Sequence, residues 1–168
     1  WPSWWSAPFW LAYGVLYGSA SDSRWHECSH GTAFKTPWMN NWVYQIASFM
    51  MMRNSATWRW SHARHHSETH FVGRDPEIAV MRPPELAKLI LNFFGILDVI
   101  RFFPNLIRNA ISGPTPAEKT FVPEGEWGKV RRVSLIHLSI YAVTLIAAIS
   151  WRSILPLMVI GLPRMYGA

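Results

Sequence analysis

The chain has 168 residues, enough for one domain, and half of them are hydrophobic while only 15% are charged. Soluble domains carry roughly 25% charged residues, so this composition argues against an ordinary soluble domain and favours bilayer segments that alternate with polar ones. The net charge of +6 comes from Lys and Arg that stand beside apolar runs. This scatter argues against a nucleic-acid partner and for contact with anionic membrane lipid.

The first expected element is an uncharged apolar helix over residues 4–20, at the short end for a membrane crossing. It leads into a first histidine cluster, His26-Glu27-Cys28-Ser29-His30. Because residues i and i+4 share one face of a helix, His26 and His30 are predicted to project together. Cys28 falls between them, and we expect it to point away and pack as a small residue.

A second uncharged stretch, residues 36–52, precedes the second histidine cluster, His62-Ala63-Arg64-His65-His66. The spacing of its three histidines places them on one helical face. A single crossing by residues 36–52 would put the two clusters on opposite sides of a membrane. We therefore expect an interfacial or re-entrant segment there, so that all five imidazoles converge on one pocket at the edge of the bilayer.

The next segment, Asp75-Pro76-Glu77, is typical of a helix start, because Asp caps, Pro fits the first position and Glu suits the positive end of the dipole. After a break at Pro83-Pro84, apolar residues at helical spacing predict a basic amphipathic helix over residues 85–108. Such a helix lies in the headgroup plane of a membrane. A surface helix on a soluble core is the alternative.

Residues 112–128 are rich in Pro, Gly and Glu and predict a loop. Residues 133–151 carry no charge and follow a basic run, which predicts a transmembrane helix with a cytoplasmic N-terminal end. Residues 154–163 then predict a return limb. His137 lies inside the apolar run, and both packing and a functional role stay open for it. The expected fold class is an all-α integral membrane protein.

Imidazole is the commonest side-chain ligand for iron, zinc and copper, so the two clusters predict a catalytic metal centre. The first cluster alone also fits the HExxH pattern of zinc metalloproteases, with Glu27 as base. That alternative needs a third ligand, for which Asp98 is a weak candidate. Five imidazoles exceed what one zinc with an open position needs, which favours either two metals or one metal with further imidazoles around its ligands. A membrane protein that only buffers metal is a further alternative.

An HxxxH cluster, a spacer, and an HxxHH cluster followed by Gly73-Arg74-Asp75-Pro76-Glu77 resemble the membrane fatty acid desaturase family, which is related to hydroxylases. The resemblance extends over nearly the whole chain, to residues 162–167. It implies two iron ions, in the Fe2+/Fe3+ states, with O2 as co-substrate. It also implies that the histidine helices lie on the cytoplasmic side of a helical membrane domain. By position it implies metal ligands at His26, His30, His62, His65 and His66.

The activity implied by this resemblance is O2-dependent desaturation of a fatty acyl chain, or hydroxylation of an alkane, sterol or carotenoid in the related enzymes. Electrons are expected from a separate partner such as ferredoxin, rubredoxin or cytochrome b5, since the sequence contains no flavin or nicotinamide motif. The family also has a third histidine box. Residues 1–168 are therefore expected to be an internal fragment of one desaturase-like domain, inactive by itself.

Carboxylates near the histidines are candidates to orient the imidazoles. Glu27, Glu68 and Asp75 are the residues in question, and ordinary solvated or capping carboxylates are the alternative. His70 departs from the family pattern. It follows His66 by four residues, so it would face the metals if the helix continued.

Overall fold

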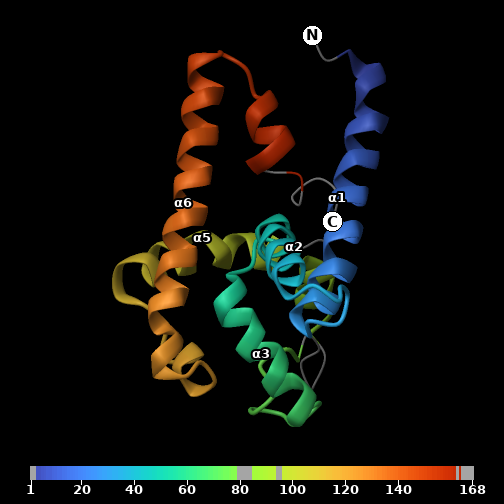
Figure 1. The fold of residues 1–168 in the computed structure, drawn as a ribbon. Coiled ribbons are helices and arrows are strands. Elements are labelled where there is room, and N and C mark those ends of the chain that lie inside the picture. The colour runs from blue at the N-terminus through green and yellow to red at the C-terminus, as the bar shows by residue number, and fades with distance from the viewer. Residues whose placement is uncertain (1–2, 79–84, 94–95, 162, 164–168) are drawn as a thin grey trace. The chain divides into compact units, whose positions relative to one another are not determined.

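The computed structural model describes residues 3–78, 85–93, 96–161 and 163. Every regular element in these residues is helical, which confirms the predicted all-α class (Figure 1). The chain divides into two compact units, one formed by residues up to Met52 and from Ser139 on, the other by Arg53–Leu138. The elements are η1 (Trp4–Ser6), α1 (Ala7–Ser29), α2 (Pro37–Met50), α3 (Ser55–Ser67), α4 (Leu86–Phe93), α5 (Ile96–Ser112), η2 (Glu118–Thr120), η3 (Glu124–Glu126), α6 (Trp127–Ser150) and the π-helical η4 (Leu157–Gly161).

In the first unit, α1 and α2 pack against each other along small and aromatic residues. Trp25 of α1 stacks on Tyr44 of α2 with ring centroids 6.3 Å apart. Small residues along this stripe let the backbones approach closely. The buried positions of α1 recur every three or four residues, as an interhelical face requires: Gly14, Gly18, Ser21, Trp25 and Cys28.

The connection between α1 and α2 is short and fixed by hydrogen bonds. Gly31, with φ of 73°, ends α1 by donating its N–H to the Cys28 carbonyl at 3.1 Å. The buried Asn40 side chain donates to the carbonyls of Gly31 and Phe34 at 2.9 and 2.7 Å and accepts from the Phe34 N–H at 3.0 Å. At 14 residues, α2 is shorter than the roughly 20 residues that a membrane crossing needs.

The helix with the strongest membrane character is α6. Residues Glu124–Ser150 form the single helix in the described ranges that is long and apolar enough to cross a membrane. Its exposed side is aliphatic and includes Val143, Ile146 and Ile149, whereas polar groups lie in its narrow buried stripe. A helix that is more apolar outside than inside suits lipid rather than water. The buried stripe consists of Val130, Ser134, His137, Thr144 and Ala148.

The chain reverses after α6, as the predicted hairpin requires (Figure 1). Arg152 adopts φ of 46°, and the Ser153 N–H donates to the Ala148 carbonyl at 2.9 Å, which closes the helix end. In the return segment, the Val159 carbonyl accepts a hydrogen bond from the Tyr13 hydroxyl of α1 at 2.8 Å. Apart from Pro163, the motif at residues 162–167 lies outside the described residues.

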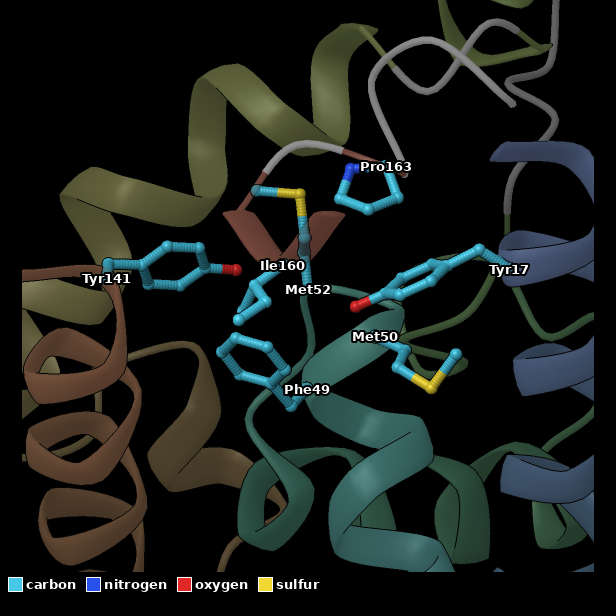
Figure 2. Close-up of a pocket in the computed structure, with 7 residues that line it drawn as sticks. All are labelled: Tyr17, Phe49, Met50, Met52, Tyr141, Ile160 and Pro163. Atoms are coloured by element: carbon cyan, nitrogen blue, oxygen red, sulfur yellow. The ribbon is translucent and has the colours of Figure 1, made fainter. Parts of the chain in front are cut away.

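A small hollow lies within the first unit between α1, the end of α2, α6 and the return segment (Figure 2). The hydroxyl groups of Tyr17 and Tyr141 point into it from opposite sides, and the Phe49 ring lies 5.2 Å from that of Tyr141. The remaining lining is apolar. The hollow is lined by Tyr17, Phe49, Met50, Met52, Tyr141, Ile160 and Pro163.

In the second unit, the amphipathic segment expected over residues 85–108 forms α4 and α5, and α5 continues to Ser112. The predicted break at Pro83-Pro84 lies outside the described residues. One side of α5 is buried, with Phe102 and Leu106 as its large side chains. The opposite side exposes isoleucines at helical spacing beside arginines, a pattern typical of a helix at a membrane surface. The exposed isoleucines are Ile96, Ile100, Ile107 and Ile111.

Candidate metal centre

The helix that carries the second histidine cluster, α3, begins at an asparagine with two functions. The Asn54 Oδ1 accepts hydrogen bonds from the N–H groups of Ala56 and Thr57 at 3.1 and 3.2 Å, which caps the helix. Its Nδ2 donates to the Val130 carbonyl and to the Ser134 hydroxyl of α6, both at 2.9 Å. The start of the histidine helix is therefore tied to the first turns of α6.

The C-terminal half of α3 is held by Arg64. Its Nε donates to Glu68 Oε2 at 2.8 Å, and its Nη1 donates to the carbonyl and hydroxyl oxygens of Thr120 at 3.1 and 3.2 Å. The Glu68 carboxylate therefore orients an arginine, and it binds no imidazole. Together Asn54 and Arg64 fix both ends of the helix within the second unit.

The histidines of α3 lie on one face, as their spacing predicts. The Nε2 atoms of His62 and His66 are 3.1 Å apart, and their rings are nearly perpendicular. The His65 ring lies 5.9 Å from both. His62 is buried, and His66 is exposed. Two ring nitrogens this close are near enough to bind one metal ion.

The buried carboxylate of Asp75 contacts the Nδ1 atom of His65. Both oxygens of Asp75 lie within 3.0 Å of His65 Nδ1, and the Asp75 side chain is fully buried. Burial by itself would raise the pKa of Asp75. Hydrogen bonds from the N–H groups of Glu77 and His70, together with the His65 ring, outweigh it and lower this pKa to about 2. Asp75 is therefore an ionised acceptor for the His65 Nδ1–H.

The expected helix start at Asp75 is wrong. Pro76 and Glu77 form a turn, and Ile78 after them is irregular. Asp75 does accept the Glu77 N–H at 2.9 Å, the bond that a helix cap would make, but its other contacts are to His65 and to the His70 N–H. The Asp75 carboxylate therefore stabilises the turns that follow the histidine helix.

Sequence reasoning missed Glu77 as a partner of a histidine. Its Oε2 lies 3.0 Å from His62 Nδ1, and its Oε1 accepts a hydrogen bond from the Ser61 hydroxyl at 3.0 Å. No helical periodicity connects His62 with a residue beyond the end of α3. The available signal was the position of Glu77 two residues after Asp75, on the same turn.

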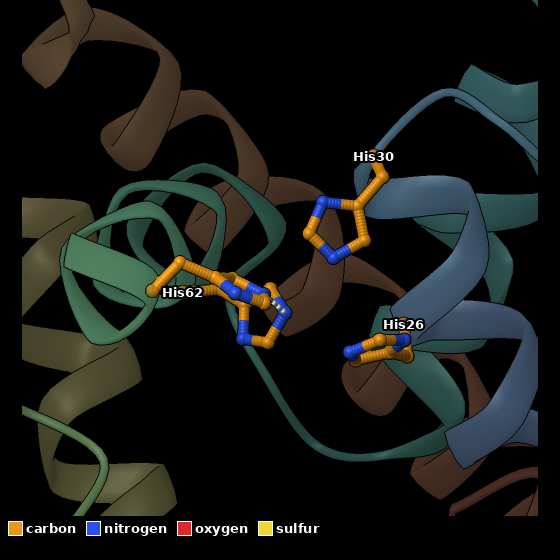
Figure 3. Close-up of side chains that lie close together, drawn as sticks. His26, His30 and His62 are labelled. Carbon is orange, nitrogen blue, oxygen red and sulfur yellow. Dashed lines mark hydrogen bonds between the residues drawn. The ribbon is translucent and has the colours of Figure 1, made fainter. Parts of the chain in front are cut away.

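The first histidine cluster lies at the end of α1, beside a carboxylate that is largely exposed. The rings of His26 and His30 have centroids 5.0 Å apart and ligand nitrogens within 4.8 Å (Figure 3). Glu27 Oε1 lies 3.2 Å from His26 Nδ1, but its side chain is 61% exposed. Cys28, between these two histidines, is buried in the face of α1 that carries Trp25.

The two histidines outside the clusters lie in different surroundings. His70 is exposed in a turn with φ of 64°, because α3 ends at Ser67, so the helical continuation that would turn it toward the metals is absent. His137 is buried in α6. The other five histidines form two groups on helix ends, each with ring nitrogens close together. Imidazole donors backed by carboxylates are a set that fits iron.

These features define a helical protein with two imidazole-rich helices whose ring nitrogens are close enough together to hold metal. A family model described as fatty acid desaturase matches residues 2–168. The chain therefore belongs to the membrane fatty acid desaturase family, and the predicted resemblance is confirmed.

The curated relatives match over a shorter stretch. The chain is 34% identical over 74 residues to the sn-1 acyl-lipid omega-3 desaturase (ferredoxin) of Synechocystis sp.. It is also 34% identical, over 77 residues, to the acyl-lipid (9+3)-(E)-desaturase of Dimorphotheca sinuata and to the omega-6 fatty acid desaturase, endoplasmic reticulum isozyme 1, of Glycine max. Each match covers 44% of this chain and 20% of the relative, so the chain spans about a fifth of these proteins' length. No solved structure matches the chain.

Proposed function

We propose that the chain is part of a membrane-bound enzyme that introduces a double bond into a fatty acyl chain, using O2 and two iron ions. The observation that carries the proposal is the arrangement on α3, where carboxylates hold the Nδ1 atoms of His62 and His65 and the Nε2 atom of His62 faces that of His66. The family match over residues 2–168 supports the same reaction class.

In this proposal the metal ligands are the five clustered histidines. When bound, iron in its Fe2+/Fe3+ states supplies the O2 chemistry that removes hydrogen from an unactivated C–H bond. The protein's part is to present neutral imidazoles in fixed orientations, since a wrongly placed or protonated ring does not bind. Asp75 fixes His65, and Glu27 has the weaker corresponding position beside His26. The ligands are His26, His30, His62, His65 and His66.

The membrane placement follows from α6. We propose that this helix crosses the bilayer with Lys129 and Arg131 at its cytoplasmic end. Asn54 supports a cytoplasmic metal centre, because its side chain ties the histidine helix to Val130, next to that basic end. The bilayer would then deliver the fatty acyl lipid. A soluble or membrane-bound donor such as ferredoxin, rubredoxin or cytochrome b5 would supply electrons from the cytoplasm.

We further propose that residues 1–168 are an internal part of one desaturase domain, with the remaining iron ligands in a third histidine box beyond them. A related hydroxylase would use the same clusters, and its product would separate the two activities. The zinc protease alternative requires Asp98 as a third ligand. Asp98 lies on α5, and its side chain is outside the described part of the structure.

The test expresses the full-length protein that contains this chain in a host lacking the corresponding unsaturated products. Gas chromatography with mass spectrometry would detect a new double bond, formed only with O2, iron and an electron donor. His66→Ala should abolish the product. The matched control is His70→Ala, another exposed histidine of the same segment that should retain it. A new hydroxyl group, activity without O2, or equal activity of both variants would contradict the proposal.

A further inference from the structure

We infer that Glu77 is a positioning residue for the metal centre, which acts by holding the His62 ring with Nε2 directed toward the metal side. The inference rests on the proposed iron site. It adds a residue that the sequence pattern assigned to a helix start. The contact joins positions 15 residues apart, from the middle of α3 to the turn after it.

The contacts of Glu77 use both of its carboxylate oxygens. Oε2 accepts from His62 Nδ1 at 3.0 Å, and Oε1 accepts from the Ser61 hydroxyl at 3.0 Å. The side chains of His62 and Glu77 are only 7% and 13% exposed, so little water competes for these bonds. A carboxylate held at both oxygens has a fixed plane, and it therefore fixes the direction of the imidazole bonded to it.

This contact decides which ring nitrogen of His62 carries the hydrogen. A carboxylate oxygen accepts the hydrogen bond, so the ring N–H of His62 lies on Nδ1 and the lone pair lies on Nε2. That Nε2 atom faces His66 Nε2 at 3.1 Å. Without Glu77, His62 would be free to place its hydrogen on Nε2, where it blocks metal binding.

The turn at Pro76 couples Glu77 to the neighbouring carboxylate. Asp75 and Glu77 stand on either side of this proline, and the Glu77 N–H donates to Asp75 Oδ1 at 2.9 Å. The two carboxylates bind His65 and His62, which are three residues apart on α3. One rigid turn thus supports two imidazoles of the same helical face.

The experiment uses the full-length protein in detergent and compares Glu77→Ala, Glu77→Gln and Glu68→Ala. Glu68→Ala is the matched control, since it removes a carboxylate that contacts the same helix through Arg64 and no histidine. The readouts are iron retention against a chelator, the absorption spectrum of the Co2+-substituted protein, and the thermal unfolding midpoint without metal.

Glu77→Ala should weaken metal retention by roughly 10- to 100-fold and change the cobalt spectrum. Metal retention by Glu77→Gln should lie between that of Glu77→Ala and that of the wild type. The amide oxygen still accepts from the His62 Nδ1–H, but the carboxylate is lost. Glu68→Ala should bind metal as the wild type does. If Glu77→Ala fails to fold without metal, the Glu77→Gln result decides.

The inference is overturned if both Glu77 variants that fold retain iron and the cobalt spectrum as the wild type and Glu68→Ala do. It is also overturned if retention falls equally in Glu68→Ala. His62→Ala separates this failure from failure of the proposed function. Loss of iron in His62→Ala, with retention in the Glu77 variants, rejects only the role of Glu77. Retention of all iron in His62→Ala rejects the metal site itself.

Discussion

The two histidine clusters have similar spacing, but the carboxylates beside them differ in exposure. At the end of α1, His26 and His30 are partly or fully exposed, and Glu27, whose carboxylate lies beside His26, is largely in solvent. On α3, His62 and His65 each have a well-buried carboxylate at Nδ1. The spacing of histidines along a helix thus sets which rings share a face. The orientation of each ring depends on residues elsewhere in the chain.

The N-terminal caps of α2 and α3 also differ. The Asn54 side chain caps α3 and binds α6, whereas Thr36, at the same position before α2, makes no capping hydrogen bond with its side chain. The first unit relies instead on the Asn40 side chain, which fixes the loop between α1 and α2. We conclude that the carboxylates of the second cluster are better shielded from water than Glu27 of the first.

The largest effect is expected from removing a buried ligand. His62→Ala should lower iron retention and product formation by more than about 100-fold, beyond the range expected for a residue that only supports a ligand. Iron content by mass spectrometry and product analysis of the full-length protein measure both. His137→Ala provides a buried histidine outside the clusters as a control. Equal iron loss in that variant would show that general destabilisation is responsible.

The second prediction compares the carboxylates of the two clusters. Asp75→Asn should reduce metal affinity roughly 10- to 100-fold, because the His65 ring loses an ionised acceptor. Glu27→Gln should change affinity by less than about threefold, since solvent already competes for its contact with His26. Chelator competition measures both. A larger loss of metal affinity in Glu27→Gln than in Asp75→Asn would contradict this prediction. The exposed carboxylate would then contribute more to metal binding than the buried one.

The third prediction concerns the helix that carries the second cluster. Asn54→Ala removes the α3 cap and two hydrogen bonds to α6, and it should cost about 2–3 kcal/mol of stability. Thr36→Ala should cost less than about 0.5 kcal/mol, because no capping bond is lost. Unfolding of the metal-free protein in detergent compares the two. Equal losses would show that the Asn54 contacts do not hold α3.

The parts of this arrangement that the sequence predicts are local ones. Helical spacing correctly grouped His62 with His66, and the uncharged run over residues 133–151 predicted a long apolar helix where the structure has α6. Local patterns misled at Asp75-Pro76-Glu77, which has the composition of a helix start. There His62 and His65 bind the two carboxylates, and these contacts stabilise a turn instead. The contact of Glu77 with His62 depends on tertiary packing, which helical periodicity cannot reveal.

The central claim is that imidazoles from both clusters bind one pair of iron ions. Applied-field Mössbauer spectroscopy of the oxidised, iron-loaded full-length protein tests it most directly, with His30→Ala and His62→Ala as one variant from each cluster. We predict a spin-coupled ferric pair with a diamagnetic ground state in the wild type, and loss of that coupling in both variants. Uncoupled ferric ions in the wild type, or coupling that survives in either variant, would contradict the account.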